Sequence, residues 1–271
     1  IKAISFFILC NIAFAFLVFT GNYCMPLARL FLCFALMLHL FSCTKQTQTL
    51  SLPSLNDYYP TQTGKSFIYR LDSTLYISFG TIVKINSYLA KDSIAGTFQD
   101  NQGRTSYIVH RYLTDTLQQQ PFVFNSDYYI TPTSTNIQVV DASNLRFIKL
   151  AAPITMGTTW QGNSYISTSA DTLSYLTGWQ YQYQNINMPD TVLSGSIDST
   201  ITVIGVNMPP TVQPFDPTLY QSNLYSAEVY AKGIGLIYKE FSYWVWQPLG
   251  SITPGYTADS YGIKLSLISH N

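Results

Sequence analysis

The chain has 271 residues, with 14 Lys and Arg against 14 Asp and Glu, so its formal net charge is zero. Charged residues make up only 10% of the chain, against about 25% in an average soluble domain. This composition excludes a disordered chain, and the lack of a basic excess argues against a nucleic-acid partner. The length allows one large domain or two small ones with a real core.

The N-terminal region has the layout of a secretory signal. Read from Met25, a positive residue, Arg29, is followed by an apolar run over residues 30–41 and then by Ser42 and Cys43. This ending resembles a bacterial lipobox, which implies lipidation of Cys43. An earlier apolar run covers residues 4–20. It is either upstream sequence before a true start at Met25, or a first membrane helix at the short limit for spanning.

All four cysteines (Cys10, Cys24, Cys33 and Cys43) lie in the first 43 residues. The rest of the chain therefore has no disulfide and no thiolate metal site, and we expect neither a metal nor a cofactor. Removal of residues 1–42 as a signal peptide region takes away Lys2 and Arg29. That leaves 12 basic residues against 14 acidic ones and a net charge of −2. We expect residues 43–54 to form a lipidated flexible tether and residues 55–271 a single β domain.

The body of the chain has the composition and the period of β-strands. It contains only two glutamates and is rich in Thr, Tyr, Ile and Val. Apolar and polar residues alternate within five stretches: 67–72, 107–113, 179–184, 197–204 and 261–267. Turn residues at Asp100–Gly103 and Lys232–Gly235 join such stretches. We predict an all-β fold, a single antiparallel meander forming a curved sheet, half-barrel or open barrel, with a β-sandwich as the alternative.

No local motif for catalysis is present in the sequence. His110 is a candidate general base, but it lies on a strand face between Ile108 and Tyr112, where a lone histidine is usually packed or hydrogen-bonded. We therefore predict that the protein is not an enzyme, unless folding pairs His110 with a carboxylate or gathers buried carboxylates.

Two aromatic strand faces are the candidate ligand platform. The first carries Trp179, Tyr181 and Tyr183, and the second carries Trp244 and Trp246. Such rings either stack on a sugar or peptide or form the core of the sheet. Because a strand end follows Trp246, we predict that one of Trp244 and Trp246 is buried and that Trp246 is the more exposed of the two.

A short motif, Asp-(Ser/Thr) followed by an apolar residue or Thr, occurs six times. It resembles the O-glycosylation acceptor motif of exported Bacteroidetes proteins. The alternative is that Asp-Ser and Asp-Thr simply occur often at the ends of strands. The candidate acceptors are Ser73, Ser93, Thr116, Thr172, Thr191 and Ser199.

Several segments together resemble the uncharacterised β-rich lipoproteins of Bacteroidetes. They are the lipobox, the YYPTQTGKSFIY segment from Tyr58, RFIKL from Arg146, and EVYAKGIGLIYKE from Glu228. The last segment is also similar to a late hairpin of periplasmic half-barrel lipid-binding proteins. The resemblance implies the compartment and the fold class, and it implies no activity. Surface-exported relatives carry acidic residues after the lipidated cysteine, which residues 44–48 lack.

These observations predict a lipid-anchored outer-membrane protein that faces the periplasm, with the cell surface as the alternative. Its only expected membrane contact is the lipid anchor. For function, we expect a binding module that holds a lipid, glycan or peptide on an aromatic-lined sheet. The alternative is a structural or interaction protein of the cell envelope with a protein partner, whose identity the sequence does not indicate.

The anchor can be tested by replacing Cys43. A Cys43→Ala protein has no acceptor for the acyl chains, so it is expected to leave the membrane fraction of fractionated cells. Cys33→Ala, inside the expected signal region, is the matched control and should leave the protein in that fraction. A Cys43→Ala protein that stays with the membranes would place the anchor elsewhere, in residues 4–20.

Overall fold

The computed structural model describes residues 53–248 and 253–271. The expected signal region 1–42 and the lipidation site Cys43 lie outside the described residues. Neither described range contains a helix whose length and apolarity would suffice to span a bilayer.

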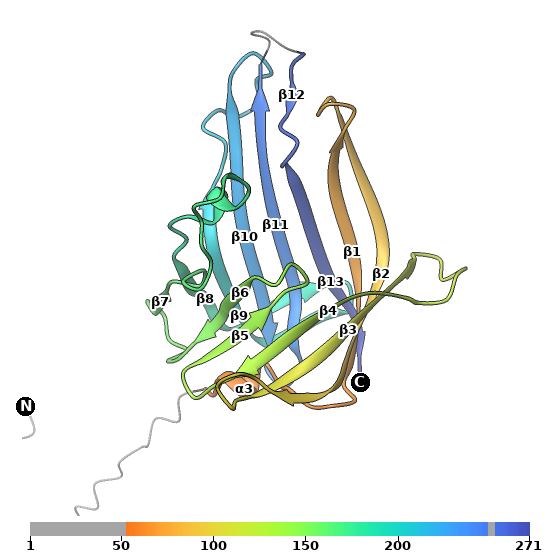
Figure 1. The fold of residues 1–271 in the computed structure, drawn as a ribbon, viewed down its shortest axis with the longest axis vertical. Helices are drawn as coiled ribbons and strands as arrows, with labels where there is room; N and C mark the ends of the chain where they lie inside the picture. Colours follow the sequence, from red (N-terminus) through yellow and green to blue (C-terminus); the bar gives the residue numbers. More distant parts are fainter. Residues whose placement is uncertain (1–52, 249–252) are drawn as a thin grey trace, which may run out of the picture. The chain divides into compact units, whose positions relative to one another are not determined.

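One antiparallel sheet contains all thirteen strands of the described ranges (Figure 1). Twelve of them follow the path β6-β5-β4-β3-β2-β1-β13-β11-β10-β9-β8-β7, and β12 pairs with β11 alone. Most sequence neighbours are therefore sheet neighbours, as in a meander. The strands are β1 (Ser66–Ile77), β2 (Ile82–Gln99), β3 (Thr105–Asp115), β4 (Val123–Pro132), β5 (Asn136–Val140), β6 (Arg146–Ala151), β7 (Thr159–Trp160), β8 (Tyr181–Val192), β9 (Gly195–Met208), β10 (Gln221–Ala231), β11 (Gly235–Gln247), β12 (Gly255–Tyr256) and β13 (Tyr261–His270).

In the described ranges, two short helices accompany the sheet, α3 (Leu55–Tyr58) and the 3₁₀ helix η1 (Asp171–Leu176). The side chain of Ser54 caps α3 by accepting a hydrogen bond from the backbone N–H of Asn56. Because α3 buries Leu55 and Tyr58, the chain is held by the fold from Ser54 onward. The last residue of the expected flexible tether is thus part of the folded body.

The sheet curls until its two ends nearly meet, which gives a barrel with one unsealed seam. At the seam, single hydrogen bonds replace a strand ladder. The backbone N–H of Ile148 in β6 donates to the carbonyl of Gly162 at 2.8 Å, and the indole N–H of Trp160 in β7 donates to the carbonyl of Ile148 at 2.9 Å. The predicted all-β open barrel is confirmed, and the β-sandwich alternative is wrong.

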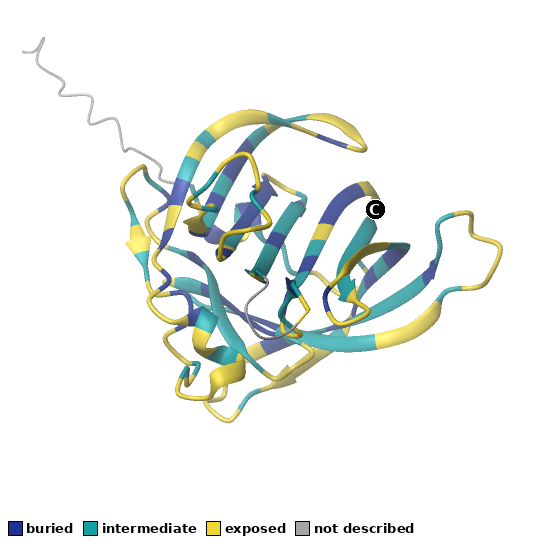
Figure 2. Ribbon diagram, turned by 90° about the horizontal axis from the view of Figure 1, so that it is seen from above, coloured by how far each residue is buried: buried dark blue, intermediate teal, exposed yellow. Residues whose placement is uncertain are grey.

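Alternation along the strands decides which side chains enter the barrel. In β3, Val109 is 1% exposed, whereas its neighbour His110 lies on the outer face and is partly exposed. The same banding of buried and less buried residues runs along the other strands in Figure 2. Branched and aromatic side chains fill the interior, among them Tyr69, Ile137, Leu150, Ile201, Tyr230, Ile237 and Leu267.

Both predicted turns are confirmed. Asp100–Gly103 connects β2 with β3, and Lys232–Gly235 connects β10 with β11. Gly233 and Gly235 have φ angles of 77° and 112°, which residues other than glycine rarely adopt.

Two isoleucines test which face is the core. Ile201 in β9 is fully buried, whereas Ile85 in β2 is 62% exposed on the outer face. We expect Ile201→Ala to lower the free energy of unfolding by about 2–5 kcal/mol, because it removes buried methylene groups and leaves a cavity. Ile85→Ala should change it by less than about 0.5 kcal/mol. Urea unfolding measures both, and equal losses would contradict the assignment of the faces.

Candidate functional site

A groove of about 520 Å³ lies on the outer face of the sheet, over β3 to β6. In β4 and β5, the lining residues Thr131 and Gln138 alternate with the interior residues Ile130 and Val139, so they point away from the barrel interior. One wall is the β2–β3 hairpin, and Tyr165 borders the opening. The lining residues are Phe98, Gln99, Asp100, Asn101, Gln102, Arg104, Ser106, Tyr129, Thr131, Gln138, Val140, Asn144, Arg146 and Tyr165.

The floor of the groove is polar, buried and internally hydrogen-bonded. Ser106, Thr131 and Gln138 are only 1–2% exposed although they lie on the outer face, since the hairpin and the neighbouring loops cover them. The hydroxyl oxygens of Ser106 and Thr131 are 2.7 Å apart. Buried polar groups are tolerated when they are bonded in this way, so the floor is a stable polar surface.

The hairpin wall is held by Asp100. One carboxylate oxygen, Oδ1, accepts hydrogen bonds from the backbone N–H groups of Gln102 and Arg104, both at 2.9 Å. The other, Oδ2, accepts from Nε and Nη2 of Arg104 at 2.8 and 2.7 Å. The hydrogen bond from the Arg104 side chain is the main cause that lowers the pKa of Asp100, to about 2. Asp100 is therefore ionised at neutral pH, and Arg104 balances its charge.

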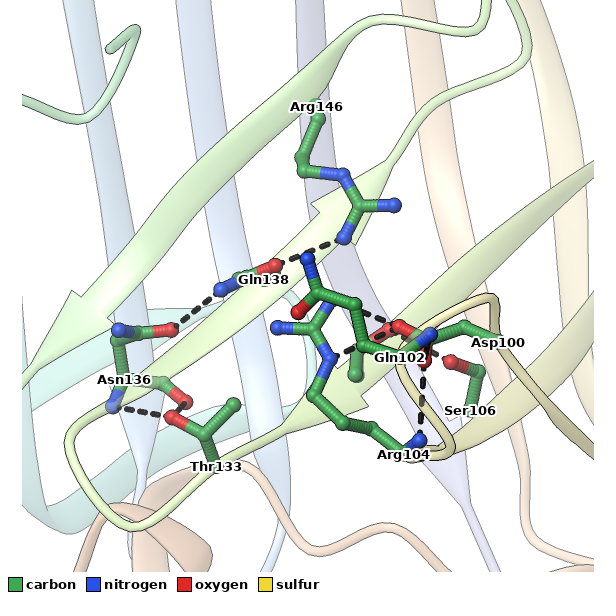
Figure 3. A network of polar contacts seen from close by, with 9 residues as sticks. Asp100, Gln102, Arg104, Ser106, Thr133, Asn136, Gln138 and Arg146 are labelled. Carbon is green, nitrogen blue, oxygen red and sulfur yellow. Dashed lines mark hydrogen bonds and ion pairs between the residues drawn. The ribbon is translucent and has the colours of Figure 1, made fainter. Parts of the chain in front are cut away.

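Across the floor from the hairpin, Arg146 stands at the start of β6 (Figure 3). Its Nη1 donates to Oε1 of Gln138 at 2.8 Å, and Nε2 of Gln138 donates to Oδ1 of Asn136 at 3.0 Å. The backbone N–H of Asn136 in turn donates to the hydroxyl of Thr133 at 2.9 Å. This chain of polar groups holds the guanidinium above the floor.

Three aromatic rings complete the lining. Phe98 and Tyr129 pack edge to face with ring centroids 5.4 Å apart. Tyr165 is 56% exposed, and the guanidinium of Arg146 lies 5.9 Å from its ring centroid. The groove therefore combines flat apolar surfaces with amide, hydroxyl and guanidinium groups.

The interior of the barrel contains a second polar cluster, around Glu228 in β10. This carboxylate is 4% exposed and lies 2.7 Å from Nζ of Lys149 and 3.6 Å from Nζ of Lys239, and it accepts a hydrogen bond from the hydroxyl of Tyr230 at 2.5 Å. Burial raises the pKa of Glu228, but the two lysines outweigh burial and lower it to about 2. Burial and the charge of Lys149 lower the pKa of Lys239 to about 8, against the opposing effect of Glu228.

A buried ion pair joins β2 and β3 inside the barrel. Arg111 binds both carboxylate oxygens of Asp92 through Nε at 2.7 Å and Nη2 at 2.6 Å. The hydroxyl of Tyr128 donates to the same carboxylate at 3.0 Å. An interior cavity of about 20 Å³ is lined in part by Tyr59, Tyr69 and Tyr128.

On the outer face, His110 pairs with a carboxylate. Its Nδ1 lies 2.5 Å from Oδ1 of Asp127, and both side chains are about one-third exposed. Ser93 is the residue opposite His110 on β2, so serine, histidine and aspartate follow one another across three strands. No hydrogen bond joins Ser93 to His110 in the described part of the chain, and none of the three lines either cavity described above. His110 and Asp127 thus form an acid–base pair that lies outside both of these cavities.

The expected aromatic platform does not exist as one surface. Trp179, Tyr181 and Tyr183 are 2–4% exposed inside the barrel, and their polar atoms are bonded within it. The aromatic alternation correctly predicted a shared face, but that face is the core. Large aromatic rings bury a large apolar area, so they dominate this core.

Trp244 and Trp246 lie on the opposite, outer face of β11. Both are partly buried, so the prediction that one is fully buried is wrong. Phe215 from the loop after β9 packs against both rings, at 6.2 and 5.4 Å between centroids, and the indole of Trp246 donates to the carbonyl of Pro217 at 3.0 Å. The sequence did not indicate that this loop would pack on the two tryptophans and partly bury them.

The six candidate glycosylation acceptors all retain some exposure. Thr172 and Thr191 are exposed, and Ser73, Ser93, Thr116 and Ser199 are partly exposed. Their modification stays a prediction. In the described ranges there is no group of three or more His, Cys, Asp and Glu side chains that could hold a metal ion.

Sequence reasoning missed the groove. Its residues come from five segments between Phe98 and Tyr165, and no single segment contains a recognisable binding motif. The signal that could have pointed to it is a short apolar strand that contains both Arg146 and Lys149. These two charged side chains lie on opposite faces, so each face of the strand requires polar partners.

No protein-family model matches the chain, and no curated protein matches it. Among solved structures, it is similar to a Bacteroides fragilis protein described as exported and as having a YmcC-like fold (TM-score 0.38, 9% identity, 79% of this chain and 98% of that chain). It is also similar to a Parabacteroides distasonis protein described as a lipoprotein (TM-score 0.38, 8% identity, 79% and 98%). A DUF1329 family protein from Desulfovibrio piger gives a TM-score of 0.18 at 11% identity, over 78% and 86%. Likeness at these TM-scores supports no statement about function.

The two glutamates of the chain provide a test of the interior cluster. Glu228→Gln leaves two lysines without their shared counter-ion, and we expect the free energy of unfolding at pH 7 to fall by about 3–5 kcal/mol. Glu240→Gln, on the outer face of β11, is the matched control and should cost less than about 1 kcal/mol.

The pH dependence has a defined sign. The folded-state pKa of Glu228, about 2, lies below its ordinary value of 4.5, so its stabilising contribution is complete above pH 4.5 and is lost as the pH falls toward 2. The stability difference between wild type and Glu228→Gln should therefore shrink over that window in urea titrations. A difference that stays constant down to pH 2 would contradict the assignment.

Proposed function

We propose that the protein is an envelope lipoprotein, anchored through Cys43 and facing the periplasm, that binds a glycan in the outer groove without transforming it. The observation that carries this proposal is the lining of the groove. Its volume of about 520 Å³ lies within the range of small-molecule sites, about 300–1,000 Å³. Aromatic rings and side-chain amides line it together, which matches the apolar faces and hydroxyl edges of sugars.

The same lining favours a glycan over a lipid. Five of its side chains are amides, which offer both donors and acceptors for hydroxyl groups: Gln99, Asn101, Gln102, Gln138 and Asn144. An acyl chain would instead need an apolar tunnel. The interior cavity of about 20 Å³ has room for about one water, far less than an acyl chain needs.

Binding without catalysis agrees with the charges of the groove. Glycoside hydrolysis generally requires two carboxyl groups on opposite sides of the scissile bond. Asp100 is the one carboxylate among the described lining residues, and Arg104 and two backbone N–H groups occupy its oxygens. His110 and Asp127 lie outside this lining.

A second function, a protein-interaction role in the envelope, is favoured by the β1–β2 hairpin. Its end exposes a run of large apolar side chains, with Phe79 96% exposed and Ile82, Val83 and Ile85 each at least half exposed. Monomeric proteins rarely present such a run without a partner.

Tyrosine substitutions test the glycan proposal. Tyr165 and Tyr220 are similarly exposed, at 56% and 61%, but only Tyr165 borders the groove. On an array of neutral and acidic oligosaccharides, followed by calorimetric titration with those retained, we expect Tyr165→Ala to weaken binding about tenfold, because a stacking face is lost. Tyr220→Ala should bind as the wild type does.

Two outcomes would count against this function. Equal losses in both variants would mean that binding occurs elsewhere. An array without retained sugars, together with a stable complex between the purified protein and another envelope protein, would favour the interaction role.

A further inference from the structure

Arg146 differs from the other arginines in the described part of the chain. Arg70, Arg104 and Arg111 each form an ion pair with an aspartate at 2.6–2.9 Å. Arg146 has no carboxylate within 4.0 Å, and residues 1–52 and 249–252 contain no Asp or Glu that could supply one. Its positive charge is therefore not neutralised within the protein.

The protein nevertheless holds this guanidinium in place. One N–H group donates to the neutral oxygen of Gln138, and Gln138 is itself held by Asn136 (Figure 3). The ring centroid of Tyr165 lies 5.9 Å from the guanidinium. A guanidinium carries five N–H donors, and a bond to an amide leaves the others available. The Arg146 side chain is thus ordered before a ligand binds, which lowers the entropy cost of binding.

The charge balance of the groove is consequently positive. The charges of Asp100 and Arg104 cancel on the hairpin wall, where Nε and Nη2 of Arg104 both contact Oδ2 of Asp100. Of the charged groups in the lining, only Arg146 remains, which gives the groove one uncompensated positive charge. A ligand that contributes one negative charge beside Arg146 would complete the balance.

We propose that the groove selects acidic glycans and that Arg146 is its specificity-determining residue. This inference rests on the proposed function, since it assigns the substrate class of the same site. A sugar carboxylate, as in a uronic acid, presents two oxygens in a plane, which matches the parallel N–H groups of a guanidinium. A sulfate or phosphate substituent offers the same negative charge with tetrahedral geometry. The aromatic rings and amides then contact the uncharged part of the sugar.

The test compares one acidic and one neutral sugar of equal length. A galacturonic acid trisaccharide and a galactose trisaccharide are titrated into the full folded body by calorimetry, with a sulfated galactose trisaccharide as a third probe. We expect the wild type to bind the uronic acid probe about tenfold more tightly than the neutral one. Tighter binding of the sulfated probe would assign the site to sulfated rather than carboxylated sugars within the same acidic class.

Three variants separate a local contact from general charge. Arg146→Gln removes the positive charge but keeps an amide donor, and it should bind both trisaccharides with the neutral sugar's affinity. Arg146→Lys should keep part of the preference, because the charge remains and the bidentate geometry is lost. Arg70→Gln removes the same charge on the outer face away from the groove, and it should keep the full preference. Thermal unfolding of each variant confirms that the fold is retained.

The outcomes distinguish the two proposals. Equal affinity of the wild type for acidic and neutral sugars, with binding still weakened by Tyr165→Ala, overturns the acidic selectivity and leaves glycan binding in place. A preference that survives in Arg146→Gln also overturns the role of Arg146. No binding of any of the three probes, together with an empty array, overturns both proposals.

Discussion

The buried ion pair between Lys149 and Glu228 is the contact on which the closed form of the sheet depends. Lys149 belongs to β6, the last strand at one end of the sheet, whereas Glu228 belongs to β10, near the other end. Only isolated hydrogen bonds join β6 to β7, so this contact across the interior draws the two ends together. A buried pair of this kind is costly unless its oxygens are bonded. The hydroxyl of Tyr230 donates to the other oxygen of Glu228, and Nζ of Lys239 lies 3.6 Å from the oxygen that Lys149 contacts.

The same six-residue strand connects the interior with the groove. Within β6, Lys149 reaches inward to Glu228 while Arg146 stands on the outer face beside Gln138. Tyrosine side chains fill much of the barrel interior and leave little room for a ligand there. The cavity that is large enough for a ligand lies instead on the outer face, where a hairpin covers the strands.

Local sequence patterns predicted the fold well, because strands and hairpins are encoded by neighbouring residues. The alternation of Val109 with His110 and the turn at Asp100–Gly103 both appear in the structure as expected. The groove and the interior cluster could not be predicted in this way. Lys149 and Glu228 are 79 residues apart, and their proximity follows from how far the sheet curls, which no local pattern records. Alternation also does not distinguish a buried aromatic face from a ligand platform, which is why the sequence left both interpretations open for Trp179, Tyr181 and Tyr183.

The charge of the whole molecule indicates how an acidic ligand would be recognised. After removal of residues 1–42, the chain carries a net charge of −2, so its long-range field does not attract anions. Selectivity must then arise at contact distance, where Arg146 is partly shielded from water by Tyr165 and the floor of the groove. Contacts at this range are much less screened by salt than steering over a Debye length of about 8 Å. A groove of this kind discriminates among ligands after they have arrived and contributes little to how fast they arrive.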